Sequence, residues 1–177
     1  VYVSRYSTLA AWNIICKLIM DVFNLTVKQI SEKIKDAQLT SVDLCKTYIE
    51  RIKKFEKDIH AWAHFDEKIL LEKAEEADNH RRSGKTLGLL HGIPVALKDI
   101  IGTLDMPTEC GTVFRKGMSA SQDAEIVDLL KNEGAIIMGK TATSELAYYS
   151  PSKTKNPHDY SRTPGGSSSG SAASVAS

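Results

Sequence analysis

The sequence has few cysteines and almost no net charge. Its three cysteines, Cys16, Cys45 and Cys110, lie far apart in 177 residues, and no two of them form a C-x-x-C pair. This spacing argues against a disulfide framework or a zinc knuckle, and a reducing cytoplasm is the expected location. Lysine and arginine number 23 against 22 aspartate and glutamate residues, which gives a net charge of +1. The sequence therefore lacks the basic surface of a nucleic-acid-binding protein and the polybasic segment of a membrane anchor.

Long apolar runs are also absent. The best candidate, residues 9–23, is interrupted by polar and charged residues and is shorter than the roughly 20 residues that a membrane span requires. The same stretch resembles a weak signal peptide, but no small-x-small cleavage site follows it. The chain begins at Val1, and Met20 lies just before the first regular helical pattern. We therefore expect residues 1–19 to be an upstream extension that is not native, with a signal peptide as the alternative.

The remaining composition is that of a folded globular domain. Apolar residues make up 42% of the chain and charged residues 25%, both ordinary values. The spacing of apolar residues predicts helices that begin near residues 26 and 41. A short strand is expected at residues 60–65, followed by a third helix that Asp66 caps and that is rich in Glu and Ala. Thr26 and Gln29 have the pattern of a capping box. Residues 20–83 are therefore expected to form an N-terminal helical segment.

In the second half of the chain, strand patterns alternate with helix patterns. Two short apolar runs, residues 93–97 and 135–138, predict buried strands. Between them, residues 121–133 predict an amphipathic helix, which Gly134 ends. A strand, a helix and a strand in this order indicate an α/β layer architecture. A further helix is expected from Ser171.

Residues 134–141 match the phosphate-loop pattern G-x-x-x-x-G-K-[ST] in every letter. That pattern indicates a nucleotide site when a strand precedes the first glycine and a helix follows the threonine. Here a helix precedes Gly134, and the four residues between the glycines are apolar and strand-like, whereas a phosphate cradle turns backbone N–H groups towards its ligand. We therefore interpret Gly134 as a helix stop and expect no nucleotide at Lys140.

Two features carry candidate chemistry. Lys98 lies at the end of the apolar run 93–97, where a lysine usually extends its amine to solvent. Burial would instead favour the neutral amine, which can accept a proton. Residues 164–171, Pro-Gly-Gly-Ser-Ser-Ser-Gly-Ser, have the composition of a flexible linker. The alternative is a glycine-rich loop that enters a helix, where hydroxyls and backbone donors converge on a substrate carbonyl.

Two other sets of residues have weaker patterns. A cysteine hydrolase that uses Cys110 with Lys98 lacks a surrounding motif, and an isolated cysteine is usually a small buried apolar residue. His60 and His64 lie four residues apart in a strand-like stretch and would face the same side. Because no third ligand is nearby, we expect a surface pair and no metal site.

Several segments, in matching order and separation, resemble the amidase signature family. They are residues 92–99 (Gly-Ile-Pro-Val-Ala-Leu-Lys-Asp), residues 107–111 (Pro-Thr-Glu-Cys-Gly), residues 134–141 with Glu145 and Leu146 after them, and Asn156-Pro157 leading into residues 165–168 (Gly-Gly-Ser-Ser). The resemblance extends from about residue 25 to the end. It implies an α/β fold with a mixed β-sheet surrounded by helices, here incomplete. It also implies amide cleavage by a Ser–Ser–Lys triad without a metal or an organic cofactor.

The resemblance further implies roles for individual residues. Lys98 would be the lysine of the triad and its final base. Ser167 would be the bridging serine, reached through a cis peptide bond after Gly166. Gly165, Gly166 and Ser168 would form the supporting loop, in which Ser168 acts by hydrogen bonding.

The sequence also departs from the family. The nucleophilic serine and the oxyanion hole of the family come from a later segment, G-T-D-x-G-G-S, which does not occur here. Residues 84–177 would therefore be the first part of the amidase core, truncated before the nucleophile, and inactive alone. Ser169 also stands where the family commonly has glycine.

Three functions are compatible with the resemblance. We expect an amidase that hydrolyses a small-molecule amide, with a homodimer as a candidate assembly and with neither nucleic acid nor membrane as a direct partner. The alternative is the A subunit of a tRNA-dependent amidotransferase, a glutaminase that works with partner subunits. Residues 145–157 look more like the general hydrolases. An inactive binding or scaffold fragment is the third interpretation.

Overall fold

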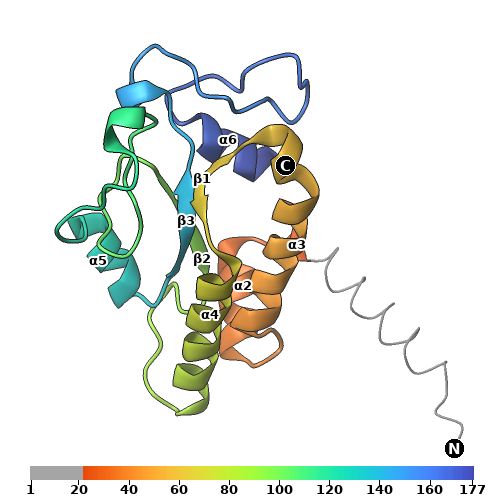
Figure 1. Cartoon of the computed structure of the whole chain (residues 1–177). Coiled ribbons are helices and arrows are strands. Elements are labelled where there is room, and N and C mark those ends of the chain that lie inside the picture. The colour runs from red at the N-terminus through yellow and green to blue at the C-terminus, as the bar shows by residue number, and fades with distance from the viewer. Residues whose placement is uncertain (1–21) are drawn as a thin grey trace, which may run out of the picture.

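The computed structural model describes residues 22–177, which form a three-stranded sheet with helices around it (Figure 1). The strands are β1 (Trp62–Phe65), β2 (Pro94–Lys98) and β3 (Ile136–Thr141), in the order β1-β3-β2. The central strand β3 is antiparallel to β1 and parallel to β2. The predicted α/β fold with a mixed sheet is therefore confirmed, whereas the expectations for residues 1–19 lie outside the described residues.

Three helices, α2 (Val27–Lys35), α3 (Ser41–Ile59) and α4 (Glu67–Arg82), come from the first half of the chain. All three were predicted, α2 and α3 from apolar spacing and α4 from its cap at Asp66 and its composition. Thr26 caps α2 through the predicted capping box. The predicted strand at residues 60–65 starts later, because His60 ends α3 in the left-handed conformation, with φ of 56°. His60 is thus outside β1, and the expectation that it shares a strand face with His64 is wrong.

In the second half, helix α5 (Glu125–Asn132) is shorter than predicted. Its start is delayed because Asp123 and Ala124 bond to an earlier loop: the Asp123 carboxylate accepts a hydrogen bond from Leu104 N at 2.8 Å, and Ala124 N donates to Gly102 O. Gly134 follows the helix with φ of 80°, as expected for a helix stop. Helix α6 (Ser169–Ala176) begins two residues before the predicted start, and short 3₁₀ turns lie at Val113–Arg115 and Glu145–Ala147.

Adjacent residues of β3 face different layers, since side chains alternate along a strand. Ile136 packs against Cys45 and Ile49 of α3 and against α4. Ile137 packs against Leu97 of β2 and Val127 of α5. Figure 1 shows the result: α2, α3 and α4 lie on one side of the sheet and α5 on the other.

Strand β3 continues through most of the phosphate-loop match. It extends past its predicted end at Met138, because Gly139 lets β1 approach: a Cβ there would lie 2.6 Å from His64 O. The side chain of Lys140 is fully buried, and its Nζ donates to Ile101 O at 2.7 Å and Thr108 Oγ1 at 2.8 Å. These residues form a strand, as interpreted from the sequence, and the lysine is enclosed by the protein's own acceptors.

Candidate active site

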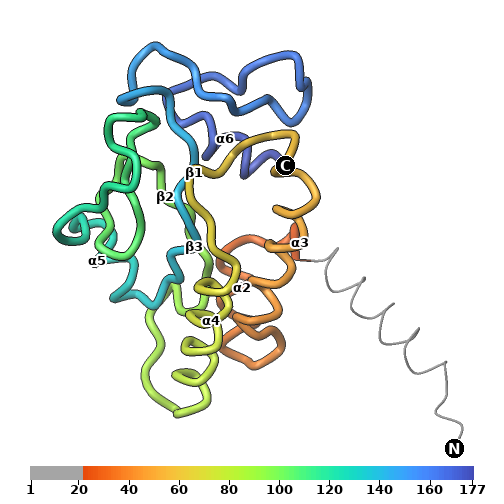
Figure 2. The backbone as a smooth tube through the Cα atoms, viewed as in Figure 1, coloured from red at the N-terminus to blue at the C-terminus, as the bar shows by residue number. Residues whose placement is uncertain are grey.

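The candidate site lies where the parallel strands β2 and β3 end. Lys98 is the last residue of β2 and pairs in register with Thr141, the last residue of β3. Figure 2 shows the later chain, residues 142–168, crossing above these strand ends before it enters α6. The carboxyl ends of parallel strands are where α/β proteins commonly bind ligands.

Lys98 and Ser167 meet at this edge. Lys98 Nζ and Ser167 Oγ are 2.5 Å apart, a short hydrogen bond between side chains 69 positions apart in the sequence. Lys98 is half-buried, and its amine is directed at the serine. The two side chains that the sequence singled out are therefore in direct contact.

The loop that carries Ser167 is held by a backbone hydrogen bond on one side and is accessible on the other. The Gly166–Ser167 peptide bond is cis, as the resemblance implies. Ser167 O accepts a hydrogen bond from Ser144 N at 3.0 Å. Gly165 has a left-handed φ of 92°, and no described heavy atom lies within 4 Å of a Cβ placed at Gly165 or Gly166. The glycines thus leave one side of the loop accessible.

Helix α6 holds the loop against the sheet. Gly170 N donates to Ala142 O at 2.8 Å. A Cβ at Gly170 would lie 2.2 Å from Ala61 O and 2.3 Å from Ala142 N, so this approach requires glycine. Thr141 Oγ1 and Ser171 Oγ form a further contact of 2.7 Å between β3 and α6.

Side-chain support for the loop comes from Ser169, which the sequence analysis did not single out for this role. Ser169 is 2% exposed, and its Oγ lies 2.6 Å from Ser152 Oγ and 3.4 Å from Ala142 O. Ser168 is exposed, and its hydroxyl makes no hydrogen bond to another residue in the range 22–177; its carbonyl accepts from Ala172 N. The serine at a position that is commonly glycine is therefore accommodated by polar partners.

Asp99, the residue after the lysine, organises a neighbouring turn. Its buried carboxylate accepts hydrogen bonds from Glu109 N at 3.1 Å and Gly111 N at 3.4 Å, and its carbonyl accepts one from Cys110 N. The place of Asp99 directly after an apolar run was a signal in the sequence that it fixes a turn, and this signal was missed.

Near Asp99, burial shifts the pKa values of Asp99 and Lys140, and the opposite charges of the two groups partly offset these shifts. Burial raises the pKa of Asp99 above its ordinary 3.8, while the backbone hydrogen bonds and the charge of Lys140 act in the opposite direction. Burial lowers the pKa of Lys140 below its ordinary 10.5, and the charge of Asp99 opposes this change. The two groups therefore stabilise each other's charged forms, beside the Lys98–Ser167 contact.

The cysteines have no comparable arrangement. Cys45 and Cys110 are free thiols, while Cys16 lies outside the described residues. Burial, with a contribution from the charge of Asp78, raises the pKa of Cys45 to about 12, which makes it an unreactive thiol. The side-chain hydrogen bond of Lys98 goes to Ser167 and not to Cys110.

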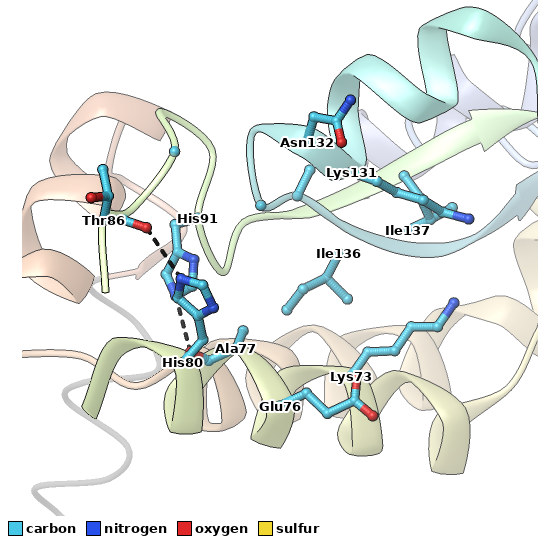
Figure 3. A pocket seen from close by; sticks show the side chains of 13 residues that line it. Lys73, Glu76, Ala77, His80, Thr86, His91, Lys131, Asn132, Ile136 and Ile137 are labelled. Atoms are coloured by element: carbon cyan, nitrogen blue, oxygen red, sulfur yellow. Dashed lines mark hydrogen bonds between the residues drawn. The ribbon is translucent and has the colours of Figure 1, made fainter. Parts of the chain in front are cut away.

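A pocket of about 390 Å³, separate from the Lys98–Ser167 contact, lies at the opposite end of the parallel strands. Its lining includes His80, His91 and Ile136 (Figure 3). Both histidines hydrogen-bond to backbone carbonyls: His91 Nε2 lies 3.0 Å from Ala77 O, and His80 Nε2 lies 3.1 Å from Thr86 O.

Within residues 22–177, no group of three or more His, Cys, Asp or Glu side chains is arranged to hold a metal ion. No helix in that range is long and apolar enough to span a membrane.

Residues 43–177 match the family model described as Amidase. The chain belongs to the amidase family. One relative in this family is the A subunit of the glutamyl-tRNA(Gln) amidotransferase of Thermoanaerobacter pseudethanolicus, to which the chain is 37% identical over 163 residues, covering 89% of this chain and 33% of the relative. The family resemblance deduced from the sequence motifs is thus confirmed.

Solved amidase structures have the same fold. The peptide amidase of Stenotrophomonas maltophilia superposes with a TM-score of 0.79 at 34% identity, over 85% of this chain and 33% of that one. An amidase family protein of Bacillus anthracis gives a TM-score of 0.79 at 32% identity, over 89% of this chain and 34% of that one. The amidase-family chain therefore spans about a third of the length of the relatives that it matches.

Proposed function

We propose that this chain supplies the lysine base and the bridging serine of an amidase that hydrolyses small-molecule amides through a Ser–Ser–Lys triad. The 2.5 Å contact between Lys98 Nζ and Ser167 Oγ carries the proposal. It joins an amine at the end of a strand to a hydroxyl in an accessible loop, where α/β enzymes commonly place their chemistry. Membership of the amidase family agrees with this assignment.

The contact supports a proton relay. In its neutral form, the Lys98 amine accepts the proton of the Ser167 hydroxyl, while Ser167 Oγ accepts a proton from a nucleophilic serine. The serine oxygen then attacks the amide carbonyl carbon. The relay runs in reverse to protonate the departing amine, so one lysine serves as both base and acid.

The nucleophile is assigned to a segment outside this chain. Among the described residues, the Ser167 hydroxyl bonds to Lys98 and to no second serine. We therefore treat residues 84–177 as the first part of an amidase core, to which the helical segment 20–83 contributes β1. The nucleophilic serine and the oxyanion donors would come from the remainder of a longer protein, as the length of the relatives suggests.

A second candidate function is that of the A subunit of an amidotransferase, which the names of the curated relatives favour. Such a protein would release ammonia from glutamine and would need partner subunits. Glutamine hydrolysis that requires added partner subunits would favour it over a free-standing amidase. The third interpretation, an inactive binding or scaffold protein, predicts hydrolysis of neither substrate class.

The experiment that tests the proposal is the substitution Lys98→Ala in the full-length protein. Ammonia release from simple primary amides should fall by about 10² or more, because proton transfer by a positioned base contributes roughly 10²–10⁴. The melting temperature should stay close to that of the wild type. Lys85→Ala, at an exposed lysine remote from the contact, is the matched control. If Lys98→Ala keeps more than about a tenth of the rate, Lys98 is not the base.

A further inference from the structure

We propose that Tyr148 and Tyr149 form an aromatic subsite beside Ser167, which selects uncharged amides that carry an aromatic group. This inference rests on the proposed function, because it assigns a substrate class to the same site. It starts from a pocket of about 510 Å³ that includes Ser167, its two preceding glycines and both tyrosines in its lining. The tyrosines thus share one cavity with the hydroxyl of the proposed relay.

Both tyrosine rings are exposed in the described part of the chain, residues 22–177. Tyr148 is 72% exposed and Tyr149 85% exposed. Their ring centroids are 4.4 Å apart with an angle of 58° between the planes, a tilted pair that presents a broad apolar surface. Aromatic side chains with this exposure are costly to leave in water, so burial against an apolar group of a substrate would be favourable.

The loop that carries the pair is fixed before any ligand arrives. Ser144 Oγ donates to Tyr148 O at 2.7 Å, and Tyr148 N donates to Glu145 O at 2.9 Å. Glu145 N donates to Ser150 O, which closes the loop after the tyrosines. Ser144 N also donates to Ser167 O, so the same residue positions the aromatic pair and the bridging serine. A preorganised surface of this kind binds with little loss of conformational entropy.

The polarity of the pocket decides which amides suit it. None of the nine described residues that line it has a charged side chain. Glutamine would bring an ammonium and a carboxylate against these nine residues, and neither charge would gain an ionic partner from them in exchange for its lost hydration. An uncharged amide with a phenyl group would instead place the ring against the tyrosines and its carboxamide towards Ser167. The pocket therefore favours aromatic amides over glutamine.

The test compares three substrates of the full-length enzyme: 3-phenylpropanamide, propanamide and glutamine. We expect kcat/KM for 3-phenylpropanamide to exceed that for propanamide by about tenfold or more, a discrimination typical of an apolar pocket. Tyr149→Ala should remove most of this preference, so that the ratio of kcat/KM for the two neutral amides falls from about tenfold towards one. Tyr149→Phe should keep the preference, because it keeps the ring. Tyr160→Ala is the control, at an exposed tyrosine outside the pocket lining.

Several results would overturn the subsite. The wild type could show no preference for the phenyl amide, or could prefer glutamine. Tyr149→Ala could slow both neutral amides equally with a lower melting temperature, which would show that the rings pack against another part of the protein. Tyr149→Gln gives a second variant if alanine impairs folding. Where propanamide hydrolysis depends on Lys98 but the phenyl preference is absent, the subsite fails and the proposed function stands; where no amide is hydrolysed, the proposed function fails.

Discussion

The contact between Lys98 and Ser167 depends on residues that are themselves held by other hydrogen bonds. Lys98 is placed by the pairing of β2 with β3. Ser167 is placed by Ser144 N, which donates to its carbonyl. Asp99 fixes the adjoining turn through two backbone N–H groups. The geometry of the pair is therefore built into the fold and does not depend on one flexible side chain finding the other.

Neighbouring serines in this loop should respond differently to substitution. Ser167→Ala in the full-length protein should lower kcat by about 10² or more, because the relay loses the hydroxyl through which the proton passes. Ser168→Ala should lose less than about tenfold, since Ser168 is exposed and its hydroxyl makes no hydrogen bond to another residue of the range 22–177. Steady-state kinetics on one primary amide checks both variants. Equal losses in the two variants would contradict the bridging role of Ser167.

Single residues were predictable from the sequence only where a local motif marks them. The end of an apolar run marked Lys98 and the glycine-rich composition marked the segment of Ser167, while the resemblance to the amidase family singled out these two residues and their roles. Ser169 could not be singled out, because its importance comes from Ser152, 17 residues earlier in the chain. Asp99 was marked by its place after the apolar run, but the turn that it fixes lies 10 to 12 residues later, and that partner is not encoded in its neighbours.

At the scale of elements, α6 is the helix that fixes the loop of Ser167 to the sheet. Gly170→Ala should lower the free energy of unfolding by about 1–3 kcal/mol, because a methyl group would overlap Ala61 O and Ala142 N. Amidase activity should fall with it, since the loop that carries Ser167 ends at the start of the same helix. Thermal melting of the full-length protein measures the effect. Ala172→Ser, which adds one atom at an exposed position of α6, should leave the melting temperature nearly unchanged, and an equal shift in both variants would contradict this packing.

The loop before β2 is attached to α4 through a histidine, and this attachment should depend on pH. Burial lowers the pKa of His91 below its ordinary 6.5, although the hydrogen bond with Ala77 O acts in the opposite direction. In the unfolded chain, the His91 imidazole therefore takes up a proton near pH 6.5, whereas in the folded protein the same imidazole stays neutral to a lower pH. The stability that neutral His91 contributes is complete above pH 6.5 and is lost as the pH falls below it.

The melting temperature of the full-length protein should accordingly fall between about pH 7.5 and pH 5.5, and His91→Gln should reduce that fall. Glutamine does not titrate, and its amide can still donate to Ala77 O. His158→Gln, at an exposed histidine, should keep the wild-type pH dependence. Identical pH profiles of the melting temperature for the wild type and His91→Gln would show that the titration of His91 does not contribute to the stability of the folded protein.

Elements were predictable where their own residues decide them. The capping box at Thr26 and the helix stop at Gly134 are local signals, and both agree with the structure. The start of α5 and the end of β3 were misjudged, because partners distant in sequence decide them. Asp123 bonds back to Leu104, and β3 extends through Thr141 since β1 and β2 pair with it on both sides.

For the whole molecule, the length of the chain is the main constraint on function. The chain spans about a third of the relatives it matches, and in the described residues β2 pairs with a strand on one side only. An unpaired strand edge is a surface for further strands. These observations agree with a core completed by a later segment, which would bring the nucleophile to Ser167.

The most direct test of this account is to find the nucleophile. The full-length protein would be treated with a fluorophosphonate, which modifies activated serines, and the modified residue would be located by mass spectrometry. We expect a single adduct on a serine outside residues 1–177, formed at least tenfold more slowly in Lys98→Ala and in Ser167→Ala. The isolated 177-residue chain should take up no label. An adduct on Ser167, on Cys110 or on any other residue of this chain would contradict the assignment of Lys98 and Ser167 as base and bridge.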